Sequence, residues 1–448
     1  MTITTARTDA EEQLARHFAK VASELPGGAW MPSVRAEAMR AFAKSGLPHR
    51  RIEEWKYTDL RTGMTTAYPP ARCSGRKIDA ALLAEALGPE LAALPCIRVV
   101  LVNGRTVAKL FPTGHEVGGS YDLGSLAGTL GQPGYEWMEA CFAGPEQAKA
   151  GAVRALNTGF VTDGVVLRVV EGAQLTLPIH IVSLVDAQEP VAVATRNLIK
   201  VEAGARVVIV ESHIGLGVSA ASRQATAVTQ LQVGDGAEVH HIQHVAGGAD
   251  ALHLCQWDVE LASTAVYRGF QLTGGMGLAR NETRASFTGP DAKFDLSGLM
   301  LGRGRDHIDT TLVVNHTTTG CESRELFKAV LDDRARAVFQ GKVVVAPEAQ
   351  KTDGKQMAQA LMLSEDAEFD SKPELEIYAD DVACGHGSTA AELDPDLLFY
   401  LRSRGLAFAE ARVLLIESFA AGALETIADE AVREAMRAVA LNWLGGAR

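Results

Sequence analysis

A cysteine and a histidine stand two residues apart in Cys384-Gly385-His386-Gly387, and this tetrapeptide carries the strongest chemical signal in the chain. On a β-strand, side chains at i and i+2 point to the same face, with their Cβ atoms about 7 Å apart. Thiolate and imidazole suit iron and iron–sulfur clusters, which take about four ligands. The pair therefore predicts part of a metal site that other groups in space, or another chain, must complete. The alternative is a buried cysteine and a turn histidine with structural roles only.

The chain contains two further groups of possible metal ligands. His316 and Cys321 flank a Thr-rich turn, which could bring them together or could merely join two strands. His240, His241 and His244 follow a Gly-Ala turn in a segment with strand character. Four strand residues would separate the first and last of these histidines by about 13 Å, which is too far for one ion. The histidine run therefore predicts a strand face rather than a metal site.

Nucleotide binding is not indicated. The segment 215–220 (GLGVSA) matches G-x-G-x-x-A, but a helix must follow such a loop to present its N-terminus to a pyrophosphate. Residues 222–233 have strand character instead. No G-x-x-x-x-G-K-[ST] loop occurs in the 448 residues. If a complex containing this chain uses ATP, another subunit must bind it.

Composition narrows the classes of protein open to this chain. Lys and Arg total 43 against 55 Asp and Glu, a net charge of -12, whereas sequence-independent nucleic-acid binding needs a basic surface. No apolar run approaches the roughly 18 residues that span a bilayer, and the first residues lack a secretory apolar core. Six cysteines occur without a C-x-x-C pair, which argues against a structural zinc site or a disulfide framework. We expect a cytoplasmic protein that binds neither nucleic acid nor membrane.

Glycine-alanine pairs recur at a fixed spacing in the middle of the chain. They begin at Gly172, Gly204 and Gly236, a period of 32 residues, and runs rich in β-branched residues flank them. Such a period is typical of stacked repeats. Sandwich strands need not keep this register, and propeller blades take about 40 residues or more, so a β-helix is favoured. The rhythm continues with drifting spacing to about Thr389, through turns at 290–292, 332–334 and 365–367.

Helical patterns occupy both ends of the chain. Helices at 11–25, 33–45 and 80–87 and a strand at 97–102 predict an N-terminal helical or α/β cap over residues 1–150. The β-helix core is expected over residues 151–391, and its two ends need capping because an open coil exposes unpaired backbone groups.

The C-terminal helical domain is expected over residues 392–448. Asp394 can cap a helix that starts at Pro395 and ends at Gly405, and further helices are predicted at 409–420 and 424–444. Three short helices cannot bury all of their apolar residues against one another. We therefore expect them to pack on the β domain or on a partner.

Several longer segments resemble one known family. Residues 323–328 (SRELFK), 336–341 (RAVFQG), 351–354 (KTDG) and 375–382 (LEIYADDV), followed by the C-x-H-G tetrapeptide, resemble the C-terminal signature of the SufB/SufD family, closer to SufD. Residues 51–60 (RIEEWKYTDL) resemble the family's N-terminal region, and would also serve as an amphipathic segment that packs Trp55 and Tyr57 onto the domain. The resemblance implies a mainly β protein with a right-handed parallel β-helix, and a non-catalytic scaffold subunit of the SUF iron–sulfur cluster assembly complex.

The same resemblance implies partners and a site. A SufB-like subunit would pair with the β domain, and the SufC ATPase would dock on the C-terminal helices. By its position in C-x-H-G, His386 corresponds to a SufD histidine that contributes to nascent cluster binding near the SufB interface, and Cys384 is carried over less firmly. Gly385 stands where a serine is usual in the family. No cofactor is expected to be bound stably by this chain alone; a nascent iron–sulfur cluster would lie at the interface with SufB.

Two alternatives remain open on the sequence. One is a β-helix enzyme acting on polysaccharide, which would normally be secreted and would carry catalytic acids or bases in an aromatic-lined groove. Against it, aromatic residues are only 6% of the chain and no signal peptide is evident. The other is a SufB-like rather than SufD-like scaffold subunit, against which the C-x-H-G motif speaks.

Overall fold

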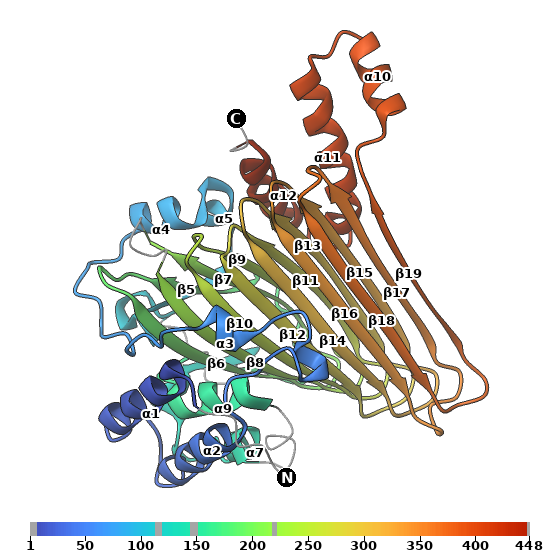
Figure 1. Cartoon of the computed structure of the whole chain (residues 1–448). Helices are drawn as coiled ribbons and strands as arrows, with labels where there is room; N and C mark the ends of the chain where they lie inside the picture. The colour runs from blue at the N-terminus through green and yellow to red at the C-terminus, as the bar shows by residue number, and fades with distance from the viewer. Residues whose placement is uncertain (1–6, 113–118, 144–150, 217–221, 446–448) are drawn as a thin grey trace, which may run out of the picture.

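The computed structural model describes residues 7–112, 119–143, 151–216 and 222–445 (Figure 1). Within these residues a parallel β-helix forms the body of the protein, and helices lie at both ends of the chain. This confirms the mainly β class, the β-helix and the two terminal helical regions; the right-handed sense and the domain boundaries stay predictions. No helix in the described part of the chain is long and apolar enough to cross a bilayer.

Successive strands of the β-helix alternate between two sheets. The ten-stranded sheet has the order β19-β17-β15-β13-β11-β9-β7-β5-β1-β2, and the nine-stranded sheet has the order β18-β16-β14-β12-β10-β8-β6-β4-β3. The strands are β1 (Ile97–Val102), β2 (Arg105–Thr106), β3 (Tyr121–Ser125), β4 (Val165–Val169), β5 (Ile179–Val185), β6 (Val191–Val201), β7 (Arg206–Gly215), β8 (Arg223–Val233), β9 (Glu238–Ala246), β10 (Leu252–Leu261), β11 (Val266–Gly274), β12 (Leu278–Phe287), β13 (Lys293–Gly302), β14 (His307–His316), β15 (Glu322–Leu331), β16 (Arg336–Val345), β17 (Asp353–Met362), β18 (Glu368–Ile377) and β19 (Ala383–Ala391).

The predicted 32-residue repeat is structural. Gly172, Gly204 and Gly236 adopt φ angles of 71°, 64° and 65°, a left-handed region that glycine enters without steric cost. Each donates its N–H to the carbonyl just before the next corner, as Gly204 does to Asp235 O at 2.8 Å. Four later residues with positive φ continue this ladder of corners in place of a Gly-Ala pair: Thr264, Asp291, Gly320 and Lys351.

One part of the repeat prediction is wrong. The sequence predicts that the turns at 290–292, 332–334 and 365–367 continue one drifting series of corners. In the structure, 290–292 follows β12 on this ladder, whereas 332–334 follows β15 and 365–367 follows β17, both on the opposite side of the coil. A sequence period does not separate the two kinds of corner, because each coil contains one of each.

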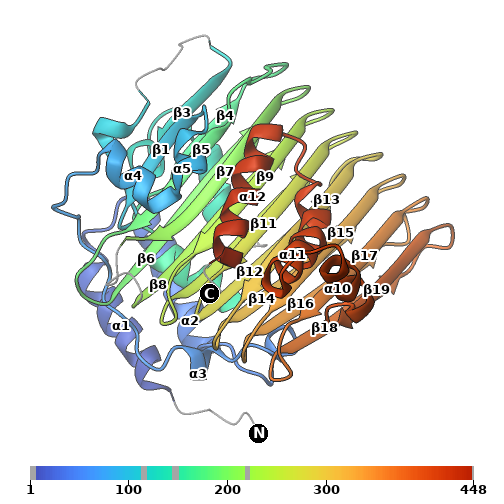
Figure 2. The ribbon, with the colours of Figure 1, turned by 90° about the horizontal axis from the view of Figure 1, so that it is seen from above.

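The helices cover the outer faces of both sheets (Figures 1 and 2). They are α1 (Asp9–Val21), α2 (Met31–Ser45), α3 (Leu60–Gly63), α4 (Ala80–Leu87), α5 (Pro89–Ala93), α6 (Leu126–Thr129), α7 (Trp137–Ala143), α9 (Gly151–Phe160), α10 (Pro395–Ser403), α11 (Phe408–Leu424) and α12 (Glu430–Gly445), with 3₁₀ turns η1 (Glu53–Trp55) and η2 (Ala108–Leu110). α1, α2 and α9 pack over the nine-stranded sheet, and α4, α5, α11 and α12 pack over the ten-stranded sheet.

Several predicted helix boundaries are wrong. α1 begins at Asp9 because Thr8 and Glu11 form a capping box, and it ends at Val21, before a turn that leads to Pro26. α2 begins two residues earlier than predicted, at Met31, with a proline in its first turn. Leu424 ends α11 instead of starting the last helix; the Asp429 side chain accepts from Val432 N at 3.0 Å and caps α12.

The C-terminal helices divide between the body and solvent. Ile416 and Leu424 of α11 and Met436 of α12 are buried with strand residues of the ten-stranded sheet. α10 has no buried residue, and the α10–α11 hairpin projects from the body in Figure 1. The prediction that these helices pack on the β domain is therefore confirmed for α11 and α12 only.

The N-terminal segment 51–60 crosses the outer face of the nine-stranded sheet. Trp55 is 8% exposed and lies 4.0 Å from the Arg280 guanidinium. Arg280 also pairs with Asp309, which accepts from the Thr58 hydroxyl. The packing predicted for Trp55 is confirmed, while Tyr57 is only partly buried.

Candidate functional site

The two ends of the β-helix differ, and the end at its last coil is called the open end. At the first coils, the antiparallel strands β2 and β3 end the two sheets. At the last coil, β18 and β19 end them, and within the described residues no further strand pairs with their outer edges. Most residues of these two strands are at least partly exposed, whereas the strands before them are largely buried. Unpaired edges of this kind are templates for pairing with another chain.

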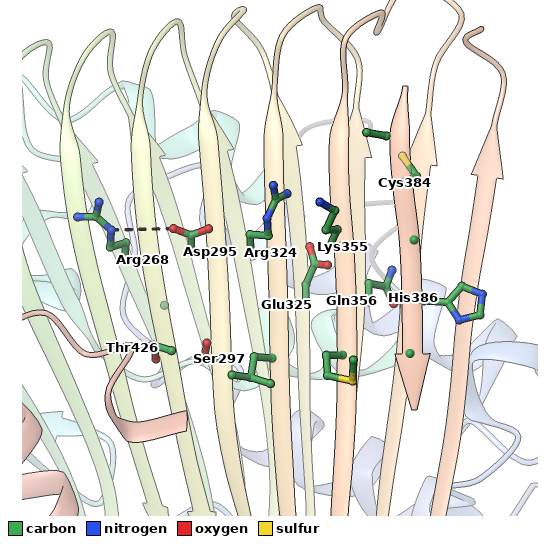
Figure 3. Close-up of a pocket in the computed structure, with 16 residues that line it drawn as sticks. Arg268, Asp295, Ser297, Arg324, Glu325, Lys355, Gln356, Cys384, His386 and Thr426 are labelled. Atoms are coloured by element: carbon green, nitrogen blue, oxygen red, sulfur yellow. Dashed lines mark ion pairs between the residues drawn. The ribbon is translucent and has the colours of Figure 1, made fainter. Parts of the chain in front are cut away.

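Cys384 and His386 both lie on the open end, on β19 (Figure 3). They pair in register with Gly354 and Gln356 of β17, whose buried positions face the interior of the β-helix. The two side chains therefore share the interior-facing side of the strand, as predicted. Because no coil follows β19 within the described residues, Cys384 is only half-buried against the core and His386 is exposed.

The Cys384 thiol is held in its protonated form. Burial raises its pKa above the ordinary value, and the carboxyl groups of Asp353 and Glu325 act in the same direction, against the backbone of Gly354. Only the thiolate is a good metal ligand. Binding of a metal at Cys384 must therefore release a proton, so its affinity rises with pH.

Glu325 is a buried acid just beneath this end that the sequence did not single out. It lies on β15 opposite Gln356, so that Glu325, Gln356 and His386 form one row across three strands. Burial raises the pKa of Glu325 to about 8, although the side chain of the neighbouring Ser323 acts in the opposite direction. The alternation of Ser323, Glu325 and Phe327 along the strand was the signal that could have found it.

A groove of about 820 Å³ runs along the outer face of the ten-stranded sheet up to β19. A row of charged residues crosses its floor in strand register, through Arg268, Asp295, Arg324 and Lys355 to Gly385 (Figure 3). Oppositely charged side chains in this row and next to it form ion pairs. Arg268 Nε, for example, lies 3.9 Å from Asp295 Oδ2. A Cβ at Gly385 would meet no atom within 4 Å, so the serine usual in the family would fit there.

The structure does not bring His316 and Cys321 together. His316 Nε2 lies 3.1 Å from Ser323 Oγ, whereas Cys321 Sγ lies 3.4 Å from Thr318 Oγ1. Both residues are buried inside the β-helix. Among the described residues, no three His, Cys, Asp or Glu side chains converge closely enough to hold a metal ion.

The histidine run lies on a strand, as predicted, but it belongs to a polar cluster that the sequence did not reveal. His240, His241 and His244 are buried on β9. The Glu211 carboxylate contacts His241 Nε2 at 2.8 Å and His213 Nε2 at 3.2 Å. Burial opposes its ionisation, yet these two hydrogen bonds outweigh burial and hold the pKa of Glu211 well below its usual range.

The sequence predicts that residues 215–220 do not bind a dinucleotide, because a strand and not a helix is expected after them. That strand is present as β8, which begins at Arg223 where a dinucleotide site would need the N-terminus of a helix. Residues 217–221, which include most of the Gly-rich segment, lie outside the described residues.

The fold and the site define a class of protein: a parallel β-helix whose open end carries a thiol, an imidazole and two unpaired strand edges. Two family models match the chain, the SufBD core domain of the SUF system for FeS cluster assembly over residues 183–419 and the SufBD N-terminal region over residues 8–181. The chain therefore belongs to the SufBD family, and its role is in iron–sulfur cluster assembly.

Individual relatives agree over most of the chain. SufD of Escherichia coli is 29% identical over 420 residues, which cover 92% of each chain. An iron–sulfur cluster assembly SufBD family protein of Synechocystis is 32% identical over 391 residues, covering 85% of this chain and 84% of the relative. SufD of Bacillus subtilis is 27% identical over 292 residues, covering 64% and 65%. The comparisons therefore place the chain in the SufBD family and give no support to the alternative of a polysaccharide-acting enzyme.

Proposed function

We propose that this chain is a non-catalytic scaffold subunit of a SUF iron–sulfur cluster assembly complex, and that it pairs with a SufB-like subunit through its open end. The observation that carries the proposal is the last coil, where β18 and β19 leave both sheets unpaired and turn interior-facing positions to solvent. Natural proteins cover or blunt such edges unless a partner uses them. Near this end, Ile377 and Tyr378 are 39% and 63% exposed, as an interface requires.

The nascent cluster would lie between the two subunits. His386 supplies an exposed imidazole and Cys384 a half-buried thiol from one strand. A cluster takes about four ligands, so the partner must provide the rest. This division explains why the described part of the chain lacks a complete metal site by itself, and the cluster is cargo of the complex rather than a resident cofactor.

The SufC ATPase would dock on the α10–α11 hairpin. Leu397, Phe399 and Tyr400 of α10 are 51%, 74% and 53% exposed, and Phe408 and Leu414 of α11 are 54% and 45% exposed. An apolar surface on a projecting hairpin is typical of a protein interface. The chain has no P-loop, so an ATPase must be a separate subunit.

Anaerobic purification of the native complex tests this proposal. The full-length chain is expected to co-purify with a SufB-like subunit and an ATPase, and to carry iron and sulfide only when both the chain and the SufB-like subunit are present. The isolated chain should bind neither iron nor sulfide stably. Recovery of a stable cluster on the isolated chain, or recovery of the ATPase complex without this chain, would contradict the assignment.

A further inference from the structure

A buried arginine lies inside the β-helix, and no residue in the described part of the chain forms an ion pair with it. Arg223 begins β8 on the same face as Ala227 and Leu231, which belong to the interior core, and it is only 1% exposed. Its Nη2 donates to the Ala246 carbonyl at 2.5 Å. Within the described residues, its Nε and Nη1 have no hydrogen-bond partner and no carboxylate pairs with it.

A second unpartnered side chain lies diagonally across from it on the next strand. His253 of β10 pairs in register with Ala225, two residues beyond Arg223 on the same face. It is 1% exposed, and neither ring nitrogen has a partner in the described part of the chain. Burial lowers its pKa, and the charges of His213 and Arg223 lower it further. His253 is therefore neutral, with one N–H to donate.

Glu211 does not serve as the missing counterion. Its two carboxylate oxygens already contact His213 Nε2, His241 Nε2 and the Thr229 hydroxyl, at 3.2, 2.8 and 2.7 Å. The His213 ring, which contacts Glu211, has its centroid 4.9 Å from that of His253. None of the described carboxylates therefore compensates the guanidinium charge, and burying an unpaired charge is costly.

We propose that Arg223 and His253 form an interior site for a small monovalent anion, a halide or hydrosulfide. A guanidinium only donates hydrogen bonds, so its ligand must accept them. A water molecule would satisfy the donors but leave the charge unbalanced. The number of free donors suits a monatomic or diatomic anion better than a phosphate. Space is also limited, because a side chain at Gly247 would place its Cβ 3.0 Å from Arg223 Nη2.

Thermal unfolding of the full-length chain at constant ionic strength provides the first test. Replacing sodium gluconate with sodium bromide should raise Tm in a saturable way, because an anion that binds only the folded state stabilises it. In Arg223→Gln this rise should be lost, while the control Arg206→Gln, at a half-exposed surface arginine, should keep it. An equal Tm in both salts, or an unchanged response in Arg223→Gln, overturns the proposal.

Anomalous diffraction from wild-type crystals in sodium bromide covers the case in which Arg223→Gln does not fold. A bromide peak within contact distance of Arg223 and His253 is expected. A water at that position, with bromide only on the surface, overturns the proposal. An anaerobic series with sodium hydrosulfide in place of bromide distinguishes the two anions by which gives the larger shift in Tm. This site lies on β8 and β10, away from β19, so its failure leaves the proposed scaffold function untouched.

Discussion

At the scale of single residues, position in the coil stack decides what each ionisable group can do. Glu325 and His386 lie in one row of interior-facing positions, separated by Gln356. Glu325 lies two coils deeper in the stack than His386. Its carboxyl group is therefore buried, whereas the His386 imidazole is exposed to solvent. An exposed imidazole can bind metal readily, whereas a buried acid affects the pH dependence of folding.

His386→Ala should lower cluster formation on the complex by about tenfold or more, by analogy with the loss when groups that support metal sites are removed. The free energy of unfolding of the His386→Ala protein should differ from that of wild type by less than about 0.5 kcal/mol, because the His386 side chain is exposed. Cys384→Ala should have the smaller effect on cluster formation. Iron and sulfide content after anaerobic reconstitution measures both variants. The control is Ser388→Ala, an exposed position on the same face of β19; normal cluster formation by His386→Ala would make the motif structural.

Glu325→Gln should make the protein more stable relative to wild type as pH rises. The folded-state pKa of about 8 lies above the ordinary value of 4.5, so between these pH values the folded state binds more protons than the unfolded state. Wild-type stability therefore falls as pH rises through this window, by at most about 1.4 kcal/mol per pH unit for one proton.

Urea unfolding of wild type and Glu325→Gln at pH 5, 6, 7 and 8 measures this difference. The control Glu322→Gln changes an acid on the same strand that is 42% exposed and paired with Lys293, and it should show no such trend. Parallel stability curves for wild type and Glu325→Gln would mean that Glu325 is ionised in the folded protein.

At the scale of elements, corners and helices have separate tasks. Each corner that follows an even-numbered strand from β4 to β16 contains a left-handed residue, and this residue is glycine at 172, 204 and 236. α11 and α12 complete the cover of the ten-stranded sheet, so a truncation after Thr389 would expose core as well as remove a docking surface. Point substitutions on α10 therefore test docking more cleanly.

Gly204→Ala should destabilise the protein by about 1 kcal/mol. The added Cβ has room, since its nearest neighbour would be Gly172 Cα at 3.9 Å; the cost arises from φ of 64° alone. Thermal or urea unfolding measures the loss. Gly75→Ala is the control, since it has open space and no positive φ, and it should be neutral or slightly stabilising. Equal stability of the two variants would show that the corner tolerates a side chain.

Phe399→Ala should weaken binding of the ATPase subunit by about 2 kcal/mol, roughly thirtyfold, as removal of an aromatic anchor does at an interface. Folding should be unaffected, because Phe399 is 74% exposed. Titration of the ATPase against the purified chain measures the affinity. Leu177→Ala, at a 45% exposed apolar residue on a corner of the β-helix, is the matched control. Undiminished binding by Phe399→Ala would move the docking site away from α10.

At the scale of the whole molecule, the β-helix is asymmetric along its axis. Its first coils end in the antiparallel strands β2 and β3, while its last coil ends in the parallel strands β18 and β19. Each middle coil is bonded on both sides, so it is protected from local opening, whereas the last coil is bonded on one side only.

Hydrogen exchange should report this asymmetry. In the isolated chain, amides of β18 and β19 should exchange faster than those of β9 and β11, because half of their neighbours are missing. A SufB-like partner should slow exchange in β18 and β19 and leave β9 and β11 unchanged. Deuterium uptake measured by mass spectrometry with and without the partner checks this. Protection that appears only on the N-terminal helices would place the interface elsewhere.

The sequence by itself determined the features that depend on local chemistry. The Gly-Ala period predicted stacked coils, because a corner requires a left-handed residue at each turn. The Asp394 cap and Pro395 predicted the start of α10 correctly. The C-x-H-G tetrapeptide predicted a thiol and an imidazole on one face of a strand.

Tertiary structure alone decided which groups these residues meet. Residues about 30 positions apart become neighbours across strands, as Glu325 and Gln356 do, and no local pattern encodes that register. A similar sequence separation brings Glu211 and His241 into contact inside the coil stack. His386 is exposed only because β19 is the last strand of its sheet; one more coil would bury it. Burial and contact depend on where the stack ends and on what lies across it, and these are properties of the assembled sheets.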